Sequence, residues 1–559
     1  MLFSENCAQT GSVASRPALL SLVFMLAALA LGAGSMVANG KPSGAAILSR
    51  IRDSINHTPG APQEECVLLQ GEAVRYGDCC SYSLLIDHSG RFLERLNGQL
   101  SSSRGYDGSA GWARDWTGTE RELPAQELEM LQAFVAILSG RWLDPDSPFE
   151  VELDDSRSSI DAVGIDLRLP GNNLGIALTV DRSSWLPRSL ETTSSDRRCR
   201  WSFEDYHRAQ QRMLPHRVTH SDDQSHNVEH YRIQRVTSPK NLALDTFHPD
   251  RPDRRDDTCF QQDQPAEVTM KVTPEGHMLV RPQIDGRQIG WFLFDMTALL
   301  AISPAAADSV EMPAFGTIAL AGLSGENSRF RQAQSFELGQ IRLEKPVLIE
   351  RDLSFLTLLC HEPVVGICGY DLVARSVVEF TPGTGRLALR DPATYPLEGA
   401  QWHNLHLDGR YPIIPAVFEG QHEGLFRLDT AGLNETLAFS NPAVTGFDLL
   451  EDRITTAGTV IGASGVVQAK LGTLLWFELA GHRFENIVAS FDVCPRSGPR
   501  RSHPLTGTIG LKMLEPFQLV LNFPRGKIAF LKRVQPSQDT TSPLTRPSRT
   551  ELILAMHYG

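Results

Sequence analysis

The chain has 559 residues, of which 41% are hydrophobic and 21% are charged, and its formal net charge at pH 7 is −13. A chain of this length is too long for one hydrophobic core, so we expect about three or four globular units rather than a disordered protein. The acidic balance argues against a nucleic-acid partner, because such a surface requires clustered lysine and arginine side chains.

An uncharged apolar run near the N-terminus is typical of a secretory signal. Arg16 precedes the run, which extends from Pro17 to about Leu31 and is followed by small residues. We therefore expect a signal peptide over residues 1–38 and a protein exported to the periplasm or the exterior. The alternative is an uncleaved anchor, because the run through Ala38 is long enough to span a bilayer. A membrane contact is expected only through this segment.

The cysteines and their spacing predict neither a metal site nor a cofactor. Cys7 lies in the expected signal, and eight further cysteines follow in the rest of the chain. An even number in an exported chain permits disulfides, but the spacing leaves their connectivity open. The sequence has no Cys-x-x-Cys, which removes the commonest zinc and redox spacings.

Residues 45–240 are expected to form a first domain in which strands dominate. Asn97-Gly98 and Asp107-Gly108 are typical hairpin turns between short strands. Residues 126–139 place their apolar side chains on one helical face, and Gly140 provides the stop. Alternating apolar segments follow, which predict further strands.

Three phrases in the second half of this domain resemble the lipoprotein-carrier (outer-membrane lipoprotein-sorting) family. They are Val180-Asp181, Phe203-Glu-Asp205-Tyr206 and Met213-Leu214-Pro215-His216. In that family a curved antiparallel sheet, closed by helices, holds an acyl chain. The resemblance implies such a sheet with a helix, and a lipid or lipoprotein ligand. A spacer or docking surface is the alternative, because fold does not determine function.

Four histidines lie close together near the end of the domain, at His216, His220, His226 and His230. Two His-x-x-x-His pairs would bind a metal on a helix, where such residues share a face. This region, however, has the pattern of two strands around a polar turn, and that spacing does not set ligands side by side on a strand. We therefore predict no metal here.

The second half of the chain contains an internal repeat. Trp291-Phe-Leu-Phe-Asp295 and Leu425-Phe-Arg-Leu-Asp429 are short apolar strands that each deliver an aspartate into a turn. Further on, Gly366-Ile-Cys-Gly369 corresponds to Gly507-Thr-Ile-Gly510. Because both units carry one aspartate at the end of a strand, the repeat predicts a single site shared between two β domains.

Composition divides the second half of the chain into four segments. A Pro-rich and charge-rich stretch at residues 241–267 is expected to be a linker. The first repeat is expected over residues 268–395 and the second repeat over residues 400–533. Residues 534–559 are rich in Pro, Ser and Thr and are expected to be a disordered tail.

These motifs together resemble the retropepsin-like aspartic peptidase family, here as a tandem pair in one chain, an arrangement that pepsin-like enzymes also use. The resemblance covers roughly residues 268–535. It implies a mainly β fold with two retropepsin-like β-barrel lobes related by pseudo-twofold symmetry, a polypeptide substrate and no cofactor. It implies a catalytic pair, Asp295 and Asp429. The implied active-site loop residues are Thr297, Thr430, Ala431 and Gly432, and the implied flap glycines are Gly322, Gly325, Gly462 and Gly465.

Two carboxylates held close together cannot both ionise easily, so they share one proton. The ionised member can deprotonate a water molecule while the protonated member hydrogen-bonds the scissile carbonyl. For each aspartate alone, the alternative is a turn residue that bonds its own backbone. Their equivalent positions in two repeats favour the catalytic interpretation.

The first repeat departs from the family pattern directly after its aspartate. The family has Thr or Ser followed by Gly, whereas this chain has Met296 and Thr297. Met296 cannot supply the hydrogen bond that the family hydroxyl makes to the opposite loop. The main hypothesis is an exported aspartic peptidase. The alternative is a catalytically inactive periplasmic peptide- or lipid-binding protein on the same fold. A third hypothesis is a peptidase that cuts only its own linker.

Overall fold

A computed structural model describes most of the chain between the two ends. The described residues are 43–55, 66–171, 174–193, 198–209, 212–223, 228–249, 256–274, 276–319, 327–382, 384–396, 400–408, 410–429, 436–462, 465–494 and 505–532. The expected signal peptide and the expected tail both lie outside these residues.

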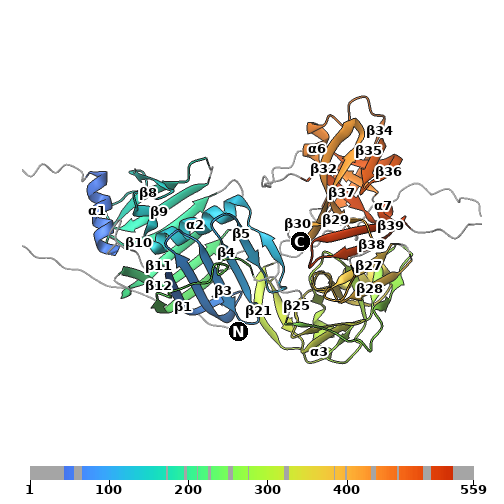
Figure 1. Ribbon diagram of the computed structural model, residues 1–559, viewed down its shortest axis with the longest axis horizontal. Helices are drawn as coiled ribbons and strands as arrows, with labels where there is room; N and C mark the ends of the chain where they lie inside the picture. Colours follow the sequence, from blue (N-terminus) through green and yellow to red (C-terminus); the bar gives the residue numbers. More distant parts are fainter. Residues whose placement is uncertain are drawn as a thin grey trace, which may run out of the picture.

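The protein is mainly β, with large antiparallel sheets and short helices (Figure 1). The helices are α1 (Gly44–Ile55), α2 (Ala125–Ser139), α3 (Pro304–Ser309), α4 (Ser354–Cys360), α5 (Tyr370–Val373), α6 (Asn441–Gly446) and α7 (Leu511–Leu514), with 3-10 turns η1 (Arg141–Leu143) and η2 (Glu419–Gln421). Among the described residues, no helix combines the length and apolar character needed to cross a membrane.

One antiparallel sheet of 13 strands forms the N-terminal domain. In spatial order its strands are β6 (Glu120–Glu122), β5 (Gly111–Arg114), β4 (Ser102–Tyr106), β3 (Phe92–Asn97), β2 (Asp78–Asp87), β1 (Cys66–Arg75), β13 (Val228–Thr237), β12 (Arg212–Asp222), β11 (Arg198–Ala209), β10 (Pro187–Thr193), β9 (Gly175–Asp181), β8 (Ala162–Arg168) and β7 (Glu150–Asp154). The chain runs along one half, crosses as α2, and returns until β13 pairs with β1.

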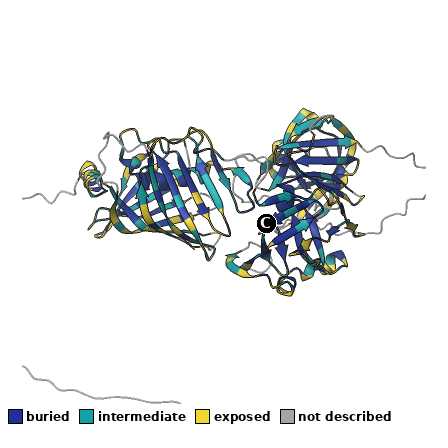
Figure 2. Ribbon diagram, turned by 60° about the horizontal axis from the view of Figure 1, so that its bottom comes forward, coloured by how far each residue is buried: buried dark blue, intermediate teal, exposed yellow. Residues whose placement is uncertain are grey.

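The core of this domain lies between the sheet and its two helices. Strands such as β13 bury alternate side chains, because successive residues of a strand point to opposite faces. Helix α2 lies across one face, and most of its residues are buried there (Figures 1 and 2). It ends at Gly140, whose φ of 75° is in the left-handed region that favours glycine. The predicted helix and both predicted hairpin turns are thus confirmed.

Two eight-stranded sheets follow, one in each repeat. The first has the order β16 (Lys271–Val272), β17 (Met278–Val280), β19 (Trp291–Asp295), β26 (Val364–Gly369), β20 (Ala301–Ile302), β25 (Val347–Glu350), β22 (Asn327–Gln332) and β21 (Ala314–Ala319). The second has the order β30 (His406–Asp408), β31 (Tyr411–Phe418), β32 (His422–Asp429), β37 (Gly507–Gly510), β33 (Leu437–Phe439), β36 (His482–Asp492), β35 (Gly465–Leu479) and β34 (Thr455–Gly462).

The two orders correspond strand for strand. In both sheets the aspartate strand pairs in parallel with the strand that carries the Gly-x-x-Gly, and a short strand pairs antiparallel on its other side. Parallel pairing requires a long crossover between the partners, and each repeat supplies it with the segment that contains its long hairpin. The repeat seen in the sequence is therefore also a repeat of topology.

A six-stranded sheet joins the repeats through backbone hydrogen bonds. Its order is β15 (Glu267–Thr269), β28 (Arg386–Arg390), β27 (Val377–Thr381), β38 (Phe517–Asn522), β39 (Lys527–Lys532) and β29 (Trp402–Asn404). At its centre β27 of the first repeat pairs antiparallel with β38 of the second, with Val377 opposite Asn522 and Phe380 opposite Leu519. One continuous apolar core extends through both repeats, so they form a single packed body.

A four-stranded sheet completes the first repeat and includes part of the segment expected to be a linker. Its strands are β14 (Thr258–Phe260), β24 (Ile341–Glu344), β23 (Ser335–Leu338) and β18 (Gln283–Ile284). Strand β14 lies within residues 241–267 and pairs with β24. Its neighbour Asp257 forms an ion pair with the buried Arg375 at 2.6 Å. Composition suggested a linker because charge is frequent there, but these charges are used in tertiary contacts.

Replacing Gly366 with alanine should destabilise the first repeat. A Cβ atom at this position would lie 2.0 Å from Cε1 of Phe292, whose side chain is fully buried, so the ring has to move. We expect Gly366→Ala to lower the free energy of unfolding by about 1–3 kcal/mol, measured by chemical denaturation. The control is Gly446→Ala, where the added atom meets nothing within 4 Å. Equal stability of the two variants would contradict this account of the repeated glycine.

Candidate functional site

The two aspartates predicted from the repeat occupy equivalent places in the structure. Asp295 is the last residue of β19 and pairs with Gly369, and Asp429 is the last residue of β32 and pairs with Gly510. Both side chains are almost completely buried, with 2% and 3% of their surface exposed. Each carboxyl group is therefore delivered by the same local geometry, a strand end facing a glycine.

One glycine of each Gly-x-x-Gly allows the backbone of a neighbouring strand to approach closely. A Cβ atom at Gly369 would lie 1.7 Å from the carbonyl oxygen of Asp295 on the aspartate strand, and one at Gly507 would lie 2.1 Å from that of Ala438 on β33. No side chain fits at either distance. Glycine is thus a steric requirement at these two positions.

The Asp295 carboxyl group has a raised pKa. Burial raises this pKa to about 6, hydrogen bonds from Thr297 oppose the rise, and the charge of Asp429 adds to it. The Thr297 amide and hydroxyl both donate to Oδ1 of Asp295, at 2.8 Å and 2.9 Å. The charge of Asp429 is thus one of the causes of the raised pKa of Asp295, because a nearby like charge disfavours the ionised form.

The loop that follows Asp295 is held in place by a second buried acid, Asp371. Its Oδ2 accepts a hydrogen bond of 2.9 Å from the Leu300 amide, and the Tyr370 amide donates to the Ala298 carbonyl at 2.9 Å. Burial raises the pKa of Asp371, and Arg375 opposes that rise. We did not predict a role for Asp371. In the sequence, Asp371 is marked only by its position two residues after Gly369, where the second repeat has a lysine.

Met296 and Thr297, the two residues after Asp295, have different surroundings. Met296 is 1% exposed and packs in the core shared by the repeats. The Thr297 hydroxyl bonds its own aspartate, so the predicted active-site loop residue does contact Asp295. Thr430, Ala431 and Gly432 lie outside the described residues.

The predicted flap glycines are placed only in part. Gly322 and Gly325 lie outside the described residues. Gly462 and Gly465 pair with each other where β34 and β35 approach their turn. The hairpins to which the predicted flap positions belong are β21–β22 in the first repeat and β34–β35 in the second.

Hairpin β21–β22 packs against the N-terminal domain. The contact is an apolar interdomain cluster, which we define as Tyr76, Leu100, Trp116, Phe315, Phe330 and Ile349. Within it the ring of Phe330 lies 6.0 Å from that of Tyr76 and 5.9 Å from that of Trp116. The Thr317 amide also donates to the Tyr76 carbonyl at 2.6 Å. Edge-on aromatic contacts and this backbone bond connect the hairpin to the domain.

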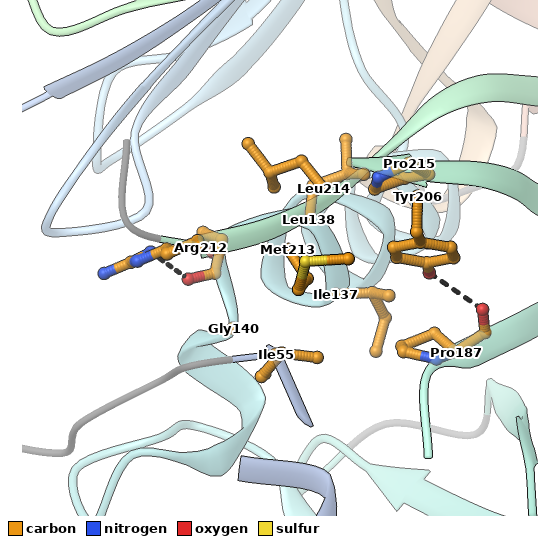
Figure 3. Close-up of a pocket in the computed structure, with 11 residues that line it drawn as sticks. Ile55, Ile137, Leu138, Gly140, Pro187, Tyr206, Arg212, Met213, Leu214 and Pro215 are labelled. Atoms are coloured by element: carbon orange, nitrogen blue, oxygen red, sulfur yellow. Dashed lines mark hydrogen bonds between the residues drawn. The ribbon is translucent and has the colours of Figure 1, made fainter. Parts of the chain in front are cut away.

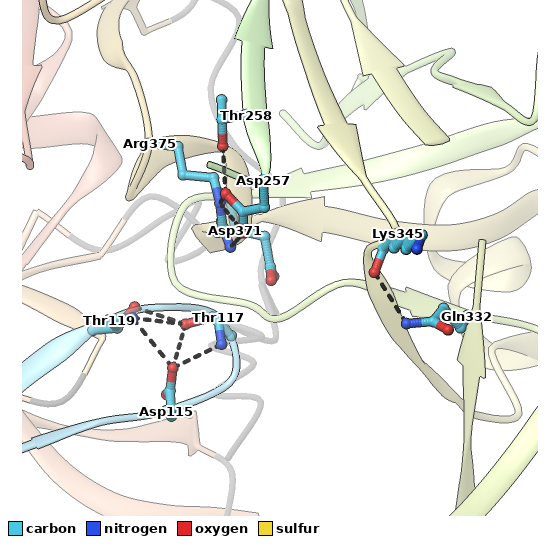
Figure 4. Close-up of polar contacts among 9 residues, drawn as sticks. All are labelled: Asp115, Thr117, Thr119, Asp257, Thr258, Gln332, Lys345, Asp371 and Arg375. Atoms are coloured by element: carbon cyan, nitrogen blue, oxygen red, sulfur yellow. Dashed lines mark hydrogen bonds and ion pairs between the residues drawn. The ribbon is translucent and has the colours of Figure 1, made fainter. Parts of the chain in front are cut away.

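The β5–β6 turn of the N-terminal domain also faces the first repeat (Figure 4). The Asp115 carboxylate holds this turn by accepting from the Thr117 amide and hydroxyl at 2.9 Å and 2.5 Å. The charge of Asp115 acts on both Asp371 and Arg375 of the first repeat. The N-terminal domain thus reaches the loop that supports Asp295.

The core of the N-terminal domain contains a small cavity. A cavity of about 10 Å³ lies beside α2, lined by Ile55, Ile137, Met213 and Leu214 among others (Figure 3). That is about the space of one water molecule. Tyr206 closes one side by donating to the Pro187 carbonyl at 2.8 Å. The cavity is too small for the acyl chain that the family resemblance implied.

The histidine-rich strands hold an internal polar contact. His220 lies 3.1 Å from Glu229, and its ring stacks on Trp201 at 4.6 Å. The prediction that these residues lie on strands is confirmed for His216, His220 and His230, and His226 lies outside the described residues. In the part of the chain that the structure describes, no group of three His, Cys, Asp or Glu residues is arranged to hold a metal ion.

These observations define a mainly β protein in which two equivalent strand ends each carry a buried carboxyl group. No known family profile matches the sequence, and no curated protein sequence matches it.

Solved structures give partial likenesses. A LolA superfamily protein from Nitrosomonas europaea is 14% identical, with 36% of this chain and 97% of that chain covered and a TM-score of 0.27. A putative outer membrane lipoprotein-sorting protein domain from Vibrio parahaemolyticus is 8% identical, with 36% and 95% covered and a TM-score of 0.25. A retropepsin-like aspartic protease from Rickettsia conorii is 16% identical, with 24% and 92% covered and a TM-score of 0.18. At these values the functions of those proteins are not transferred to this chain.

Replacing Asp295 with asparagine should change how stability depends on pH. A carboxyl group with a raised pKa stabilises the fold while protonated, and this contribution is lost as pH rises from its ordinary value of 3.8 through about 6. Asparagine keeps the acceptor for Thr297 but does not ionise. We expect Asp295→Asn and wild type to differ little near pH 4, whereas the variant should be more stable above pH 6 by about 3 kcal/mol at most.

Thermal and denaturant unfolding across this pH range measure the difference. The control is Asp263→Asn, an exposed aspartate outside the site, which should follow the wild-type curve. A constant offset between Asp295→Asn and wild type at every pH would show that burial and Asp429 do not perturb this carboxyl group.

Proposed function

We propose that this protein is an exported aspartic peptidase with two retropepsin-like β-barrel lobes related by a pseudo-twofold axis. The observation that carries the proposal is the equivalent placement of Asp295 and Asp429, each the last residue of a strand, opposite a glycine and almost completely buried. The raised pKa of Asp295 supports it. The matching strand orders and the central β27–β38 pairing support the twofold arrangement. Export rests on the N-terminal sequence pattern, and N-terminal sequencing of the secreted protein tests it.

In the proposed reaction the two carboxyl groups share one proton. Below about pH 6 the Asp295 carboxyl retains a proton and can donate a hydrogen bond to the scissile carbonyl oxygen. The Asp429 carboxylate removes a proton from a water molecule, whose oxygen then bonds to the carbonyl carbon. The resulting tetrahedral intermediate collapses when the carbon–nitrogen bond breaks, and the proton held by Asp429 passes to the leaving nitrogen. Water is consumed, and a carboxylic acid and an amine are formed.

The surroundings support these roles. The two Thr297 hydrogen bonds orient the Asp295 carboxyl, and the bond that the Leu300 amide donates to Asp371 holds the loop after it. Buried charges interact more strongly than charges in water, so a preorganised pair stabilises the transition state more effectively. Neither Met296 nor Thr297 is required to act on the substrate in this scheme.

Both members of the pair should be required for peptide hydrolysis. We expect Asp429→Asn and Asp295→Asn each to lower kcat by at least about 100-fold, because each removes a proton donor or acceptor from the reaction. Cleavage of a mixed peptide library, followed from acid to neutral pH by mass spectrometry, measures this. Activity should decline above about pH 6, where Asp295 loses its proton. Undiminished cleavage by the Asp429→Asn variant would refute the mechanism, and Asp263→Asn serves as the control.

A second function is favoured by one observation, the nearly complete burial of both carboxyl groups. A substrate reaches them only if the surrounding loops move, and without that movement the protein would bind a peptide without cleaving it. A lipid or lipoprotein ligand of the N-terminal domain likewise stays a prediction. The small apolar cavity means that such a ligand would require the helices to separate from the sheet.

A transition-state mimic of the pepstatin type separates the two functions when combined with the cleavage assay. A ligand that binds only the folded state raises its stability, by about 2.7 kcal/mol at a hundredfold excess over Kd. We expect the mimic to raise the Tm of the wild type but not of Asp295→Asn. Stabilisation without any cleavage would favour the binding protein, whereas neither stabilisation nor cleavage would contradict both functions.

A further inference from the structure

The β1–β2 turn of the N-terminal domain carries an aromatic residue where a small one is usual. Strands β1 and β2 pair as far as Arg75 and Asp78, so Tyr76 and Gly77 alone form the turn. Both have positive φ angles, 52° and 76°. Two-residue turns of this kind favour Asn, Asp or Gly at the first position, and a bulky side chain in the left-handed region is an outlier. Such an outlier points to a function of the residue outside its own turn.

Tyr76 uses this position to contact hairpin β21–β22 of the first repeat. Its ring lies edge-on to that of Phe330 at 6.0 Å, and its carbonyl oxygen accepts the hydrogen bond of 2.6 Å from the Thr317 amide. Trp116, from the β5–β6 turn, lies beside both rings, 6.4 Å from that of Tyr76 and 5.9 Å from that of Phe330. Two turns of the N-terminal domain therefore meet the fully buried ring of Phe330.

The hairpin is shaped to receive the turn. Gly316 has a φ of 49°, and a Cβ atom there would lie 2.6 Å from the carbonyl oxygen of Tyr76. Because that oxygen belongs to the backbone, only a separation of the two segments would relieve the clash. Glycine on the hairpin is thus a requirement of the contact with the turn.

The contact continues to the loop after Asp295. Leu299, four residues after Asp295, packs against the interdomain cluster and also against the core shared by the repeats. The Ile349 amide, from the same cluster, donates a hydrogen bond of 2.9 Å to the carbonyl oxygen of the next residue, Leu300. Protein interiors are close-packed and transmit strain, so a displacement of the cluster also displaces this loop.

From these contacts we infer that Tyr76 is a positioning residue for Asp295. Through hairpin β21–β22 and Leu299, the N-terminal domain holds the loop after Asp295 in the arrangement that peptide hydrolysis requires. The inference rests on the proposed function for the reaction that this loop serves. It makes the N-terminal domain a part of the catalytic unit rather than a separate carrier.

Replacing Tyr76 with asparagine in the full-length protein tests the inference. Asparagine suits the turn, so Tyr76→Asn removes the ring while β1 and β2 stay joined. We expect kcat for a cleaved peptide to fall about tenfold or more while KM changes less than about twofold, because a displaced catalytic group slows the reaction more than it weakens binding. Tyr76→Phe keeps the ring and should restore kcat to within about twofold of the wild type.

Two further variants separate positioning from a general effect on the fold. The control is Trp185→Asn, because Trp185 is also an aromatic residue with a positive φ, 57°, in a turn of the same domain, but its ring contacts Arg50 of α1. It should leave kcat unchanged. Gly316→Ala acts from the hairpin side by forcing the turn away, and it should lower kcat as Tyr76→Asn does. It decides the question if thermal unfolding shows that Tyr76→Asn is not folded.

Amide hydrogen exchange measures the positioning without any need for catalysis. In Tyr76→Asn, fragments that cover residues 297–302 and 314–319 should exchange about tenfold faster than in the wild type, because amides exchange when local structure opens. The same fragments of Trp185→Asn should exchange as in the wild type.

The inference and the proposed function fail in different ways. Unchanged exchange in these two segments, or a kcat within about twofold of the wild type for both Tyr76→Asn and Gly316→Ala, would overturn the positioning role and leave the peptidase standing. If the wild type cleaves nothing while the exchange rises as expected, the peptidase falls and the coupling of Tyr76 to the Asp295 loop stands.

Discussion

The pairing of β27 with β38 is the constraint on which the site depends. Four residues of each strand pair at the centre of the six-stranded sheet, from Val377 opposite Asn522 to Phe380 opposite Leu519. Backbone hydrogen bonds fix both the distance and the direction of two paired strands. Each repeat carries its aspartate at the end of a strand in its own sheet, so this pairing, with the shared core, determines where the two carboxyl groups meet.

Burial is the main cause of the raised pKa of Asp295. A carboxylate in a water-excluded site is destabilised, and a second carboxylate nearby adds to that effect. The structure opposes these costs locally, through the two hydrogen bonds from Thr297 to Asp295. The balance leaves a carboxyl group with a pKa of about 6. At mildly acid pH this carboxyl group is therefore present in both its protonated and its ionised form.

The N-terminal domain is more than an appended module. Tyr76 and Trp116 contact hairpin β21–β22. The charge of Asp115 contributes to the raised pKa values of Asp371 and Arg375, behind the Asp295 loop. Strand β14 and Asp257, from the segment between the domains, are built into the first repeat. The domain also lines a cavity of about 300 Å³ together with Arg410 and Tyr411 of the second repeat. The cavity beside α2, lined by Ile137 and Met213 among others, is too small for the acyl chain that the family resemblance implies.

The sequence by itself determined the local features of this protein. The alternation of apolar residues, Gly140, and the repeated Gly-x-x-Gly were sufficient for the strands, the end of α2 and the equivalence of Asp295 with Asp429, because each depends on neighbouring residues. Tertiary structure alone decided the rest. Asp371 has no recognisable motif, and it holds the loop after Asp295 only because segments far apart in the chain fold together. The charge-rich linker was misjudged for the same reason, since composition does not reveal that Asp257 has a buried arginine to pair with.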